Sequence, residues 1–244
     1  MVSAAALSIA IEPIEQTCVE RSVIERLLAL DGKRILELGC GRADLTRVLA
    51  QGGPGRHITA LEVDEIQHAK NLQLRDLPNV RFELGGAQAI PAGDASFDVV
   101  FMFKSLHHVP VALMADGLRE IARVLAPGGL AYLSEPIFAG EFNEILRLFH
   151  DEQRVRQAAF DTIAAAVAGG LFESVEQVFF KAPVMFPDFA AFERQVIGVT
   201  HTRHVLSPAL LDEVRRRFTA HAGPDGVRFA QPMRVNLLRR PALA

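Results

Sequence analysis

The sequence has only two cysteines, Cys18 and Cys40, and they do not form a CxxC pair. This scarcity excludes a zinc ribbon and a framework of disulfides. It is typical of a protein that works in a reducing compartment. We therefore expect a cytoplasmic protein.

Long hydrophobic runs and an excess of positive charge are also missing. The first residues, MVSAAALSIAIEPIE, lack a basic leader, and their apolar run stops at Glu12, which is too early to span a bilayer. Lys and Arg number 26 against 29 Asp and Glu, a net charge of -3. A general nucleic-acid binder would carry a strongly basic face. The sequence thus predicts no membrane and no nucleic-acid partner, and it leaves the oligomeric state open.

Short strand-like runs alternate with longer helical patterns along the 244 residues. This alternation predicts an α/β fold with a doubly wound, mostly parallel, seven-stranded Rossmann-like sheet and a helical lid. Ligands of such sheets bind outside the carboxyl ends of the strands. We expect strands at 33–38, 57–63, 80–84, 96–103, 130–136, 174–186 and 232–240, and helices at 14–30, 43–51, 65–75, 111–129, 141–170, 188–199 and 207–221.

These patterns are those of a single domain spanning residues 1–244, since half of the residues are apolar and can bury one large core. The expected parts are an N-terminal helical cap (1–30), a ligand-binding core (31–136), two lid or substrate segments (137–170 and 186–226) and a final strand (227–244).

The stretch ILELGCGRAD (35–44) is the first loop at such a carboxyl end. It lacks the third glycine of a GxGxxG dinucleotide loop, because Asp44 occupies that place, and it lacks the Gly-Lys-Ser/Thr ending of a P-loop. An acid, Glu37, precedes the glycines Gly39 and Gly41. A carboxylate there would repel a pyrophosphate and would suit an amino group or a sulfonium. An NAD-dependent oxidoreductase is therefore disfavoured.

Four motifs in order extend this pattern: ILELGCGRAD, ITALEVDE, GGAQAIPAGDASFDVVFMFKSLHHV and REIARVLAPGGLAYLSEP. Together they resemble the class I S-adenosylmethionine-dependent methyltransferases, over roughly residues 30 to 136. The resemblance implies S-adenosyl-L-methionine as the cofactor and a small molecule as the methyl acceptor.

The resemblance also assigns cofactor contacts. Gly39 and Gly41 would let the backbone pass the methionine part, and Glu37 would hold its amino group. Glu62 would accept hydrogen bonds from the ribose, with Asp64 as the alternative acid and as the expected cap of the next helix. Relatives often carry an adenine-binding Asp where this chain has Gly86, so backbone groups, Gln88 or stacking would read the adenine. The full expected set is Glu37, Gly39, Gly41, Glu62, Val63, Gly86, Ala87 and Lys104.

Three further residues at the strand ends are candidates for catalysis. His107 and His108 follow the fourth strand, beside the expected methyl group, and Glu135 ends the fifth. The histidines could take a proton or could simply form a structural turn. Glu135 could be a base, a substrate ligand or a structural acid before Pro136.

The lid segments are rich in phenylalanine and carry a few polar side chains, a combination typical of small-molecule pockets. Two arginines and three histidines there favour an acceptor with an acidic or strongly polar group. HTRH (201–204) has two histidines three residues apart but no third ligand nearby, so we expect no metal site. The candidate acceptor residues are His150, Arg154, His201, Arg203 and His204.

The sequence therefore predicts an S-adenosylmethionine-dependent methyltransferase that acts on a small molecule by in-line displacement. Two alternatives remain open. One is another transferase on the same cofactor fold, such as an aminopropyl transferase, and the other is a non-catalytic cofactor-binding or regulatory protein.

Overall fold

The computed structural model describes residues 6–199, 202 and 204–242. Within these residues one eight-stranded sheet has the order β3-β2-β1-β4-β5-β8-β6, and β7 pairs with β8 off that path. The first five strands are parallel, and β8 runs antiparallel to β5 and β6. The strands are β1 Arg34–Leu38, β2 His57–Glu62, β3 Val80–Leu84, β4 Phe97–Phe103, β5 Leu125–Pro136, β6 Glu173–Phe186, β7 Ala222–Gly223 and β8 Gly226–Arg239.

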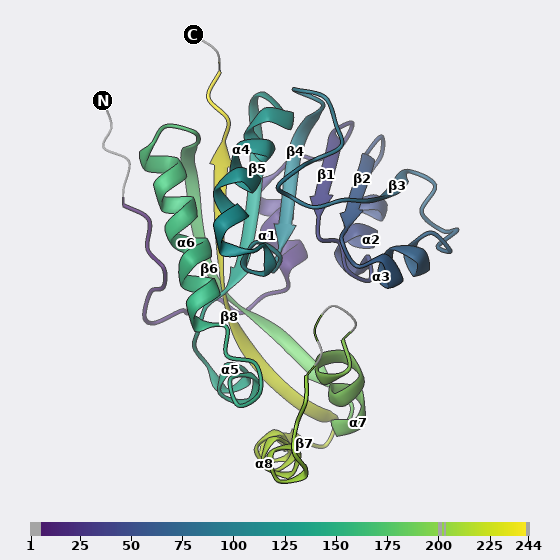
Figure 1. Cartoon of the computed structure of the whole chain (residues 1–244), viewed down its shortest axis with the longest axis vertical. Helices are drawn as coiled ribbons and strands as arrows, with labels where there is room; N and C mark the ends of the chain where they lie inside the picture. The colour runs from purple at the N-terminus through teal and green to yellow at the C-terminus, as the bar shows by residue number, and fades with distance from the viewer. Residues whose placement is uncertain (1–5, 200–201, 203, 243–244) are drawn as a thin grey trace.

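Helices cover both faces of the sheet (Figure 1). Apolar side chains of α4 and α6 pack on one face with Val100 and Leu133, and those of α1 and α2 pack on the other with Ile35 and Phe101. The α-helices are α1 Glu20–Leu27, α2 Asp44–Gln51, α3 Glu65–Asn71, α4 Met114–Val124, α5 Glu141–Leu146, α6 Gln153–Ala168, α7 Phe189–Phe192 and α8 Pro208–Thr219. Two short 3₁₀ helices are η1 Leu106–His108 and η2 Val111–Leu113, and a short π-helix is η3 Glu193–Ile197.

Strands β6 and β8 are each 14 residues long and continue past the carboxyl ends of the parallel strands. There they join α5, α7 and α8 to form a small lobe below the sheet (Figure 1). We use "the lobe" for α5, α7, α8 and the adjoining ends of β6 and β8. Its core is mainly aromatic and includes Phe142, Phe186, Phe192, Phe218 and Phe229.

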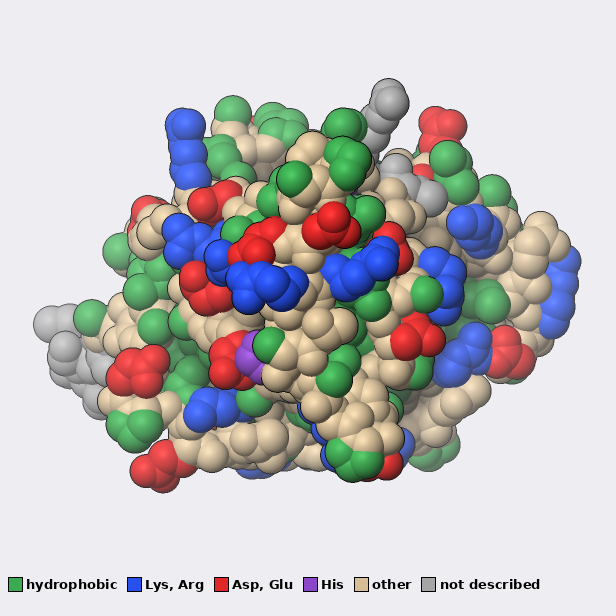
Figure 2. All heavy atoms as spheres, turned by 90° about the horizontal axis from the view of Figure 1, so that it is seen from below, with side chains coloured by type: hydrophobic (Ala, Val, Ile, Leu, Met, Phe, Trp, Pro, Cys, Tyr) green, Lys and Arg blue, Asp and Glu red, His purple; other side chains and the backbone are tan. Residues whose placement is uncertain are grey.

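The outer face of the lobe carries positive and negative side chains in alternation (Figure 2). Arg216 and Arg217 of α8 both pair with Glu213, and Arg215 lies near Glu193. The arginine cluster is therefore balanced locally by acids and does not form a surface of one sign.

The elements agree with the expected α/β architecture but differ from it in detail. The helix expected over 14–30 is confined to α1, and the chain before it is extended: Thr17 forms a bridge to Lys181 on the edge strand β6. The helix expected to reach residue 129 ends at Val124 because the backbone joins β5 from Leu125 onward. The two-residue strand β7 was not expected.

The segment 137–170 divides between two parts of the molecule. Helix α5 belongs to the lobe, whereas α6 packs against the main sheet through Ala159 and Ile163. None of the helices within the described residues is both long enough and apolar enough to cross a membrane.

Candidate active site

A pocket of about 650 Å³ lies at the carboxyl ends of β1, β2 and β4, with Thr202 contributing to its lining from the far side. A second cavity of about 510 Å³ lies at the opposite, amino ends of the strands, around Arg34 and His57. Ligands of parallel sheets bind at the carboxyl ends, so we assign the first as the site pocket. It is lined by every expected cofactor residue: Glu37, Gly39, Gly41, Glu62, Val63, Gly86, Ala87 and Lys104.

The loop after β1 is shaped by its glycines. Gly39 and Gly41 adopt positive φ angles of 72° and 52°, which favour glycine. A Cβ atom on Gly39 would lie 2.8 Å from Cβ of Ser105, which is too close. The Ser105 hydroxyl donates to the carbonyl oxygen of Leu38 at 2.8 Å, so β4 and the glycine loop are held together.

Glu37 is buried at the floor of this pocket, with 2% of its surface exposed. Its Oε2 atom has no hydrogen-bond partner among the residues that the structure describes. Burial, helped by the carboxylates of Glu62 and Asp44, outweighs the lowering effect of the Thr46 hydroxyl and raises the pKa of Glu37 to about 8. A buried carboxyl group with a vacant acceptor atom is suited to a cationic or hydrogen-bond-donating group of a ligand.

Glu62 organises the rim of the pocket. Its Oε2 accepts a hydrogen bond from the amide of Gly41 at 2.7 Å, and its Oε1 accepts from the amides of Val63 and Asp64 at 2.8 and 2.9 Å. A carboxylate has about four acceptor positions, so about one remains for a ligand in this arrangement. Asp64 accepts from the amides of Ile66 and Gln67 and caps α3, as expected.

The polar side chain nearest to Gly86 belongs to Gln88. A Cβ atom on Gly86 would lie 2.6 Å from Oε1 of Gln88. The amide of Gln88 therefore fills the space that a side chain at position 86 would occupy. Both residues line the pocket, and Ala87 is buried between them.

Lys104 directly follows β4 and has a φ of 53°, an uncommon angle for a residue with a side chain. Its backbone amide donates to the carbonyl oxygen of Ser134 at 2.7 Å, which fixes this turn to β5. The side chain is exposed and lines the pocket together with that of His108. Backbone strain of this kind is frequent at functional sites.

The two histidines after β4 lie in different surroundings. His108 is exposed at the pocket, whereas His107 is buried beneath it, with ring centroids 4.1 Å apart. His107 Nδ1 is hydrogen-bonded to Oε2 of Glu135, whose Oε1 accepts from the amide of Leu106 at 2.9 Å. His107 Nε2 lies 3.5 Å from Oε1 of Glu152.

A buried ionic network surrounds His107. Burial alone would lower the pKa of His107, but Glu135 and Glu152 outweigh it and raise the pKa to about 9. Arg156 donates to Oε2 of Glu152 at 2.5 and 3.1 Å and also to Oδ1 of Asn143 at 3.0 Å. The network therefore ties the end of β5 to the start of α6.

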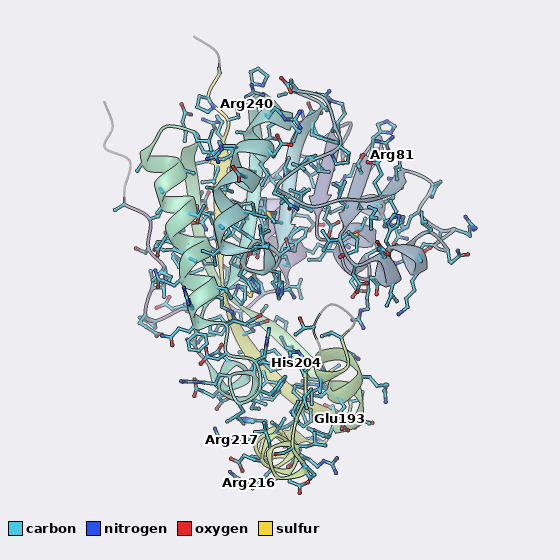
Figure 3. All side chains as sticks on the ribbon, viewed as in Figure 1. Arg81, Glu193, His204, Arg216, Arg217 and Arg240 are labelled. Atoms are coloured by element: carbon cyan, nitrogen blue, oxygen red, sulfur yellow. The ribbon has the colours of Figure 1, made fainter. Side chains whose placement is uncertain are left out.

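The five candidate acceptor residues do not form one group. His150 Nε2 lies 2.9 Å from Oε1 of Glu152, and the His150 ring lies 4.7 Å from that of His204. Figure 3 labels His204 on the side of the lobe toward the sheet. Arg154 instead lines a separate, exposed cavity with Gln157 and Asp161. The other two, His201 and Arg203, lie outside the described residues.

Sequence reasoning did not identify Glu152 or Arg156 as site residues. Glu152 directly precedes α6 and Arg156 lies four positions later, a spacing that is a signal for an ion pair on one helix face. The contact of Glu152 with His107 joins residues 45 positions apart, and no sequence pattern indicates it.

Comparisons with known proteins agree with this geometry. Residues 35–129 match the family described as the methyltransferase domain. The chain is 33% identical over 141 residues to the 27-O-demethylrifamycin SV methyltransferase of Amycolatopsis mediterranei (strain S699), covering 54% of this chain and 48% of that protein. It is 33% identical over 119 residues to the demethylmenaquinone methyltransferase of Geobacillus stearothermophilus, covering 47% and 50%. The aligned part thus spans about half the length of these relatives.

Among solved structures, the [4+2]-cyclase SpnF is similar with a TM-score of 0.60 at 21% identity, covering 91% of this chain and 79% of that one. This likeness concerns the fold. The match covers nine tenths of this chain, more than the segment 35–129 that matches the family.

Proposed function

We propose that residues 35–129, which match the methyltransferase-domain family, form a class I, Rossmann-like domain that uses S-adenosyl-L-methionine, and that the protein transfers a methyl group from this cofactor to a small-molecule acceptor. The observation that carries the proposal is the convergence of Glu37, the glycine loop and Glu62 on one pocket at the carboxyl ends of the strands. We also propose a cytoplasmic location, on the basis of the two unpaired cysteines.

The residues of the pocket fit the cofactor. Oε2 of Glu37, buried and without a partner among the described residues, suits the amino group of the methionine part. The remaining acceptor position of Glu62 suits a ribose hydroxyl, and Gln88 beside Gly86 suits a polar edge of the adenine. Val63, Ala87 and Lys104 complete the lining.

The cofactor supplies an electrophilic methyl group on a sulfonium, so the protein has to align the nucleophile and exclude water. The glycine loop and Ser105 fix the floor of the pocket. The lobe lies over the carboxyl ends of the strands and would limit access of water (Figure 1).

We infer that the acceptor lies between His108 and the lobe. His108 is the catalytic candidate that reaches the pocket, while His107 and Glu135 lie beneath it as positioning residues. We propose that His150 and His204, whose rings are 4.7 Å apart, contact a polar or acidic acceptor group, and His201 and Arg203 stay candidates by their position in the chain.

Calorimetry with S-adenosylmethionine, S-adenosylhomocysteine and NAD tests the first half of this proposal. We expect binding of both sulfur nucleosides and no binding of NAD. Binding of NAD alone would contradict the proposal.

A screen for methyl acceptance tests the second half. The names of the relatives make 27-O-demethylrifamycin SV and a demethylmenaquinone the first compounds to try. Cofactor binding without any transfer, across a broad acceptor panel, would favour a non-catalytic or non-methylating protein on the same fold.

A further inference from the structure

A cluster of His107, His108 and Glu152 lies at the base of the pocket, and no step of the proposed function requires all three together. One ligand-capable atom of each lies within 4.8 Å of the other two. His107 and Glu152 are buried, whereas His108 is exposed and lines the pocket. Two imidazoles and one carboxylate are the ligand set of one type of catalytic zinc site.

The separation of two of these atoms distinguishes a shared metal ion from a direct hydrogen bond between His107 and Glu152. His107 Nε2 and Glu152 Oε1 are 3.5 Å apart, longer than the ~2.7–2.9 Å of a hydrogen bond between charged groups. Two ligands bound to one tetrahedral zinc ion at about 2.0–2.2 Å each are about 3.3–3.5 Å apart. The distance thus fits a shared ion better than a direct bond.

The groups behind the cluster are those that orient metal ligands. Glu135 holds Nδ1 of His107, so that Nε2 points toward Glu152. Arg156 holds Oε2 of Glu152, so that Oε1 faces the histidines, and His150 also bonds to that Oε1. Carboxylate partners on the second nitrogen of a ligating histidine are a regular feature of metal sites.

We propose that His107 Nε2, a ring nitrogen of His108 and Glu152 Oε1 bind a divalent transition-metal ion such as Zn²⁺, with the fourth coordination position open to the cofactor pocket. The ion replaces the proton on His107 Nε2, which is released to solvent. This site goes beyond the expectation from the sequence, where Glu152 was not recognised and no metal was expected. His150 and Glu135 act as positioning residues for the ligands.

The catalytic role that we assign to the ion depends on the proposed methyl transfer from S-adenosylmethionine. An acceptor hydroxyl that coordinated at the open position would lose its proton to solvent more easily, because a metal ion lowers the pKa of bound oxygen. The resulting oxygen would form the new O–C bond while the S–C bond breaks and its electron pair stays on sulfur. The acceptor class is therefore a hydroxyl compound.

The test is Co²⁺ and Zn²⁺ binding to the full chain after treatment with a chelator. We expect one ion per chain, with the visible absorption of four-coordinate Co²⁺, and displacement by Zn²⁺. His108→Phe and Glu152→Gln should each weaken binding at least 100-fold, and Glu135→Gln by about 10–100-fold. His57→Ala, at the opposite end of the sheet, is the control and should bind as the unmodified protein does.

His108 is exposed, so His108→Phe should fold normally even if Glu152→Gln does not. Equal binding by the unmodified protein and His108→Phe would overturn the site, and His107 would then be an imidazolium held between two carboxylates. Binding of S-adenosylhomocysteine is measured in parallel. If the protein binds S-adenosylhomocysteine but no metal ion, only the metal site is wrong. If the protein does not bind S-adenosylhomocysteine, the proposed function is wrong, whatever the result for the metal ion.

Discussion

At the scale of single residues, we expect Glu37 to make cofactor binding depend on pH. Burial, with the neighbouring Glu62 and Asp44, raises its pKa to about 8, so the free protein carries a proton there at neutral pH. A cationic ligand group favours the carboxylate and lowers that pKa, so binding releases the proton. Affinity for S-adenosylhomocysteine should therefore rise between about pH 6 and pH 7.5, by up to about tenfold per unit.

Calorimetry in two buffers of different ionisation enthalpy measures the proton released. Glu37→Gln has nearly the same volume and cannot ionise, so it should bind weakly and with a flat pH profile. Equal pH profiles for the two proteins would show that Glu37 does not meet a cation.

Glu62 is expected to contribute both to the loop and to the ligand. Glu62→Gln replaces one acceptor oxygen by an NH₂ group, so at least one of the three backbone amides loses its partner. We expect cofactor binding to weaken by about 1.5–3 kcal/mol, or about 10–150-fold in Kd.

Asp64→Ala is the matched control for Glu62. It removes the cap of α3 and should lower the free energy of unfolding by about 1 kcal/mol while leaving Kd nearly unchanged. A Kd that rises in Asp64→Ala and not in Glu62→Gln would show that Asp64 is the ribose ligand.

The cofactor residues could be proposed from the sequence because the patterns that indicate them are short and local. Glu37, Gly39 and Gly41 lie within five positions, and Glu62 ends the next strand. Parallel strands bring such ends together without further information. Glu152 could not be predicted in the same way, because its role depends on where α6 starts after the break that follows α5.

At the scale of elements, the lobe has a hydrophobic core of its own. Phe218 of α8 is fully buried against Phe192 and Phe229, at ring-centroid distances of 4.9 and 6.0 Å. Phe218→Ala should lower the free energy of unfolding by about 3–5 kcal/mol, measured by urea denaturation. Cofactor affinity of the folded protein should stay within about threefold, or ~0.6 kcal/mol, because Phe218 does not line the pocket.

Phe172→Ala is the counterpart in the main core, where Phe172 packs with Leu106 and Ile163. It should destabilise the protein to a similar extent. A large loss of cofactor affinity in Phe218→Ala would show that the lobe and the pocket do not behave as separate units.

Element types followed from periodicity, but several boundaries did not. Residues 14–19 carry an apolar pattern that a helix would use, yet Thr17 pairs with β6, whose edge needs a partner for its backbone groups. Strand β8 begins at Gly226, well before the expected residue 232, because β6 offers it a partner over its whole length. Both differences come from pairing between distant segments.

At the scale of the whole molecule, the expected cofactor residues and the lobe belong to different parts of the structure. Every expected cofactor residue lies in the core, between β1 and β4, in the part that matches the methyltransferase domain. In the segment between η3 and α8, Thr202 lines the pocket, and His204 lies on the side of the lobe toward the sheet (Figure 3). Acceptor choice is therefore expected to depend on the lobe and cofactor binding on the core.

This division predicts different effects for two lid residues that the sequence grouped together. His150 bonds to Glu152 beneath the pocket, whereas Arg154 is exposed in a separate cavity. Once an acceptor is known, His150→Ala should lower its kcat/KM about tenfold or more, as expected for losing a hydrogen bond to a charged group worth about 1.5–3 kcal/mol. Donor affinity should change less than about threefold, or ~0.6 kcal/mol.

Arg154→Ala should leave both quantities unchanged, so a loss of turnover in Arg154→Ala, or a loss of donor binding in His150→Ala, would contradict this division.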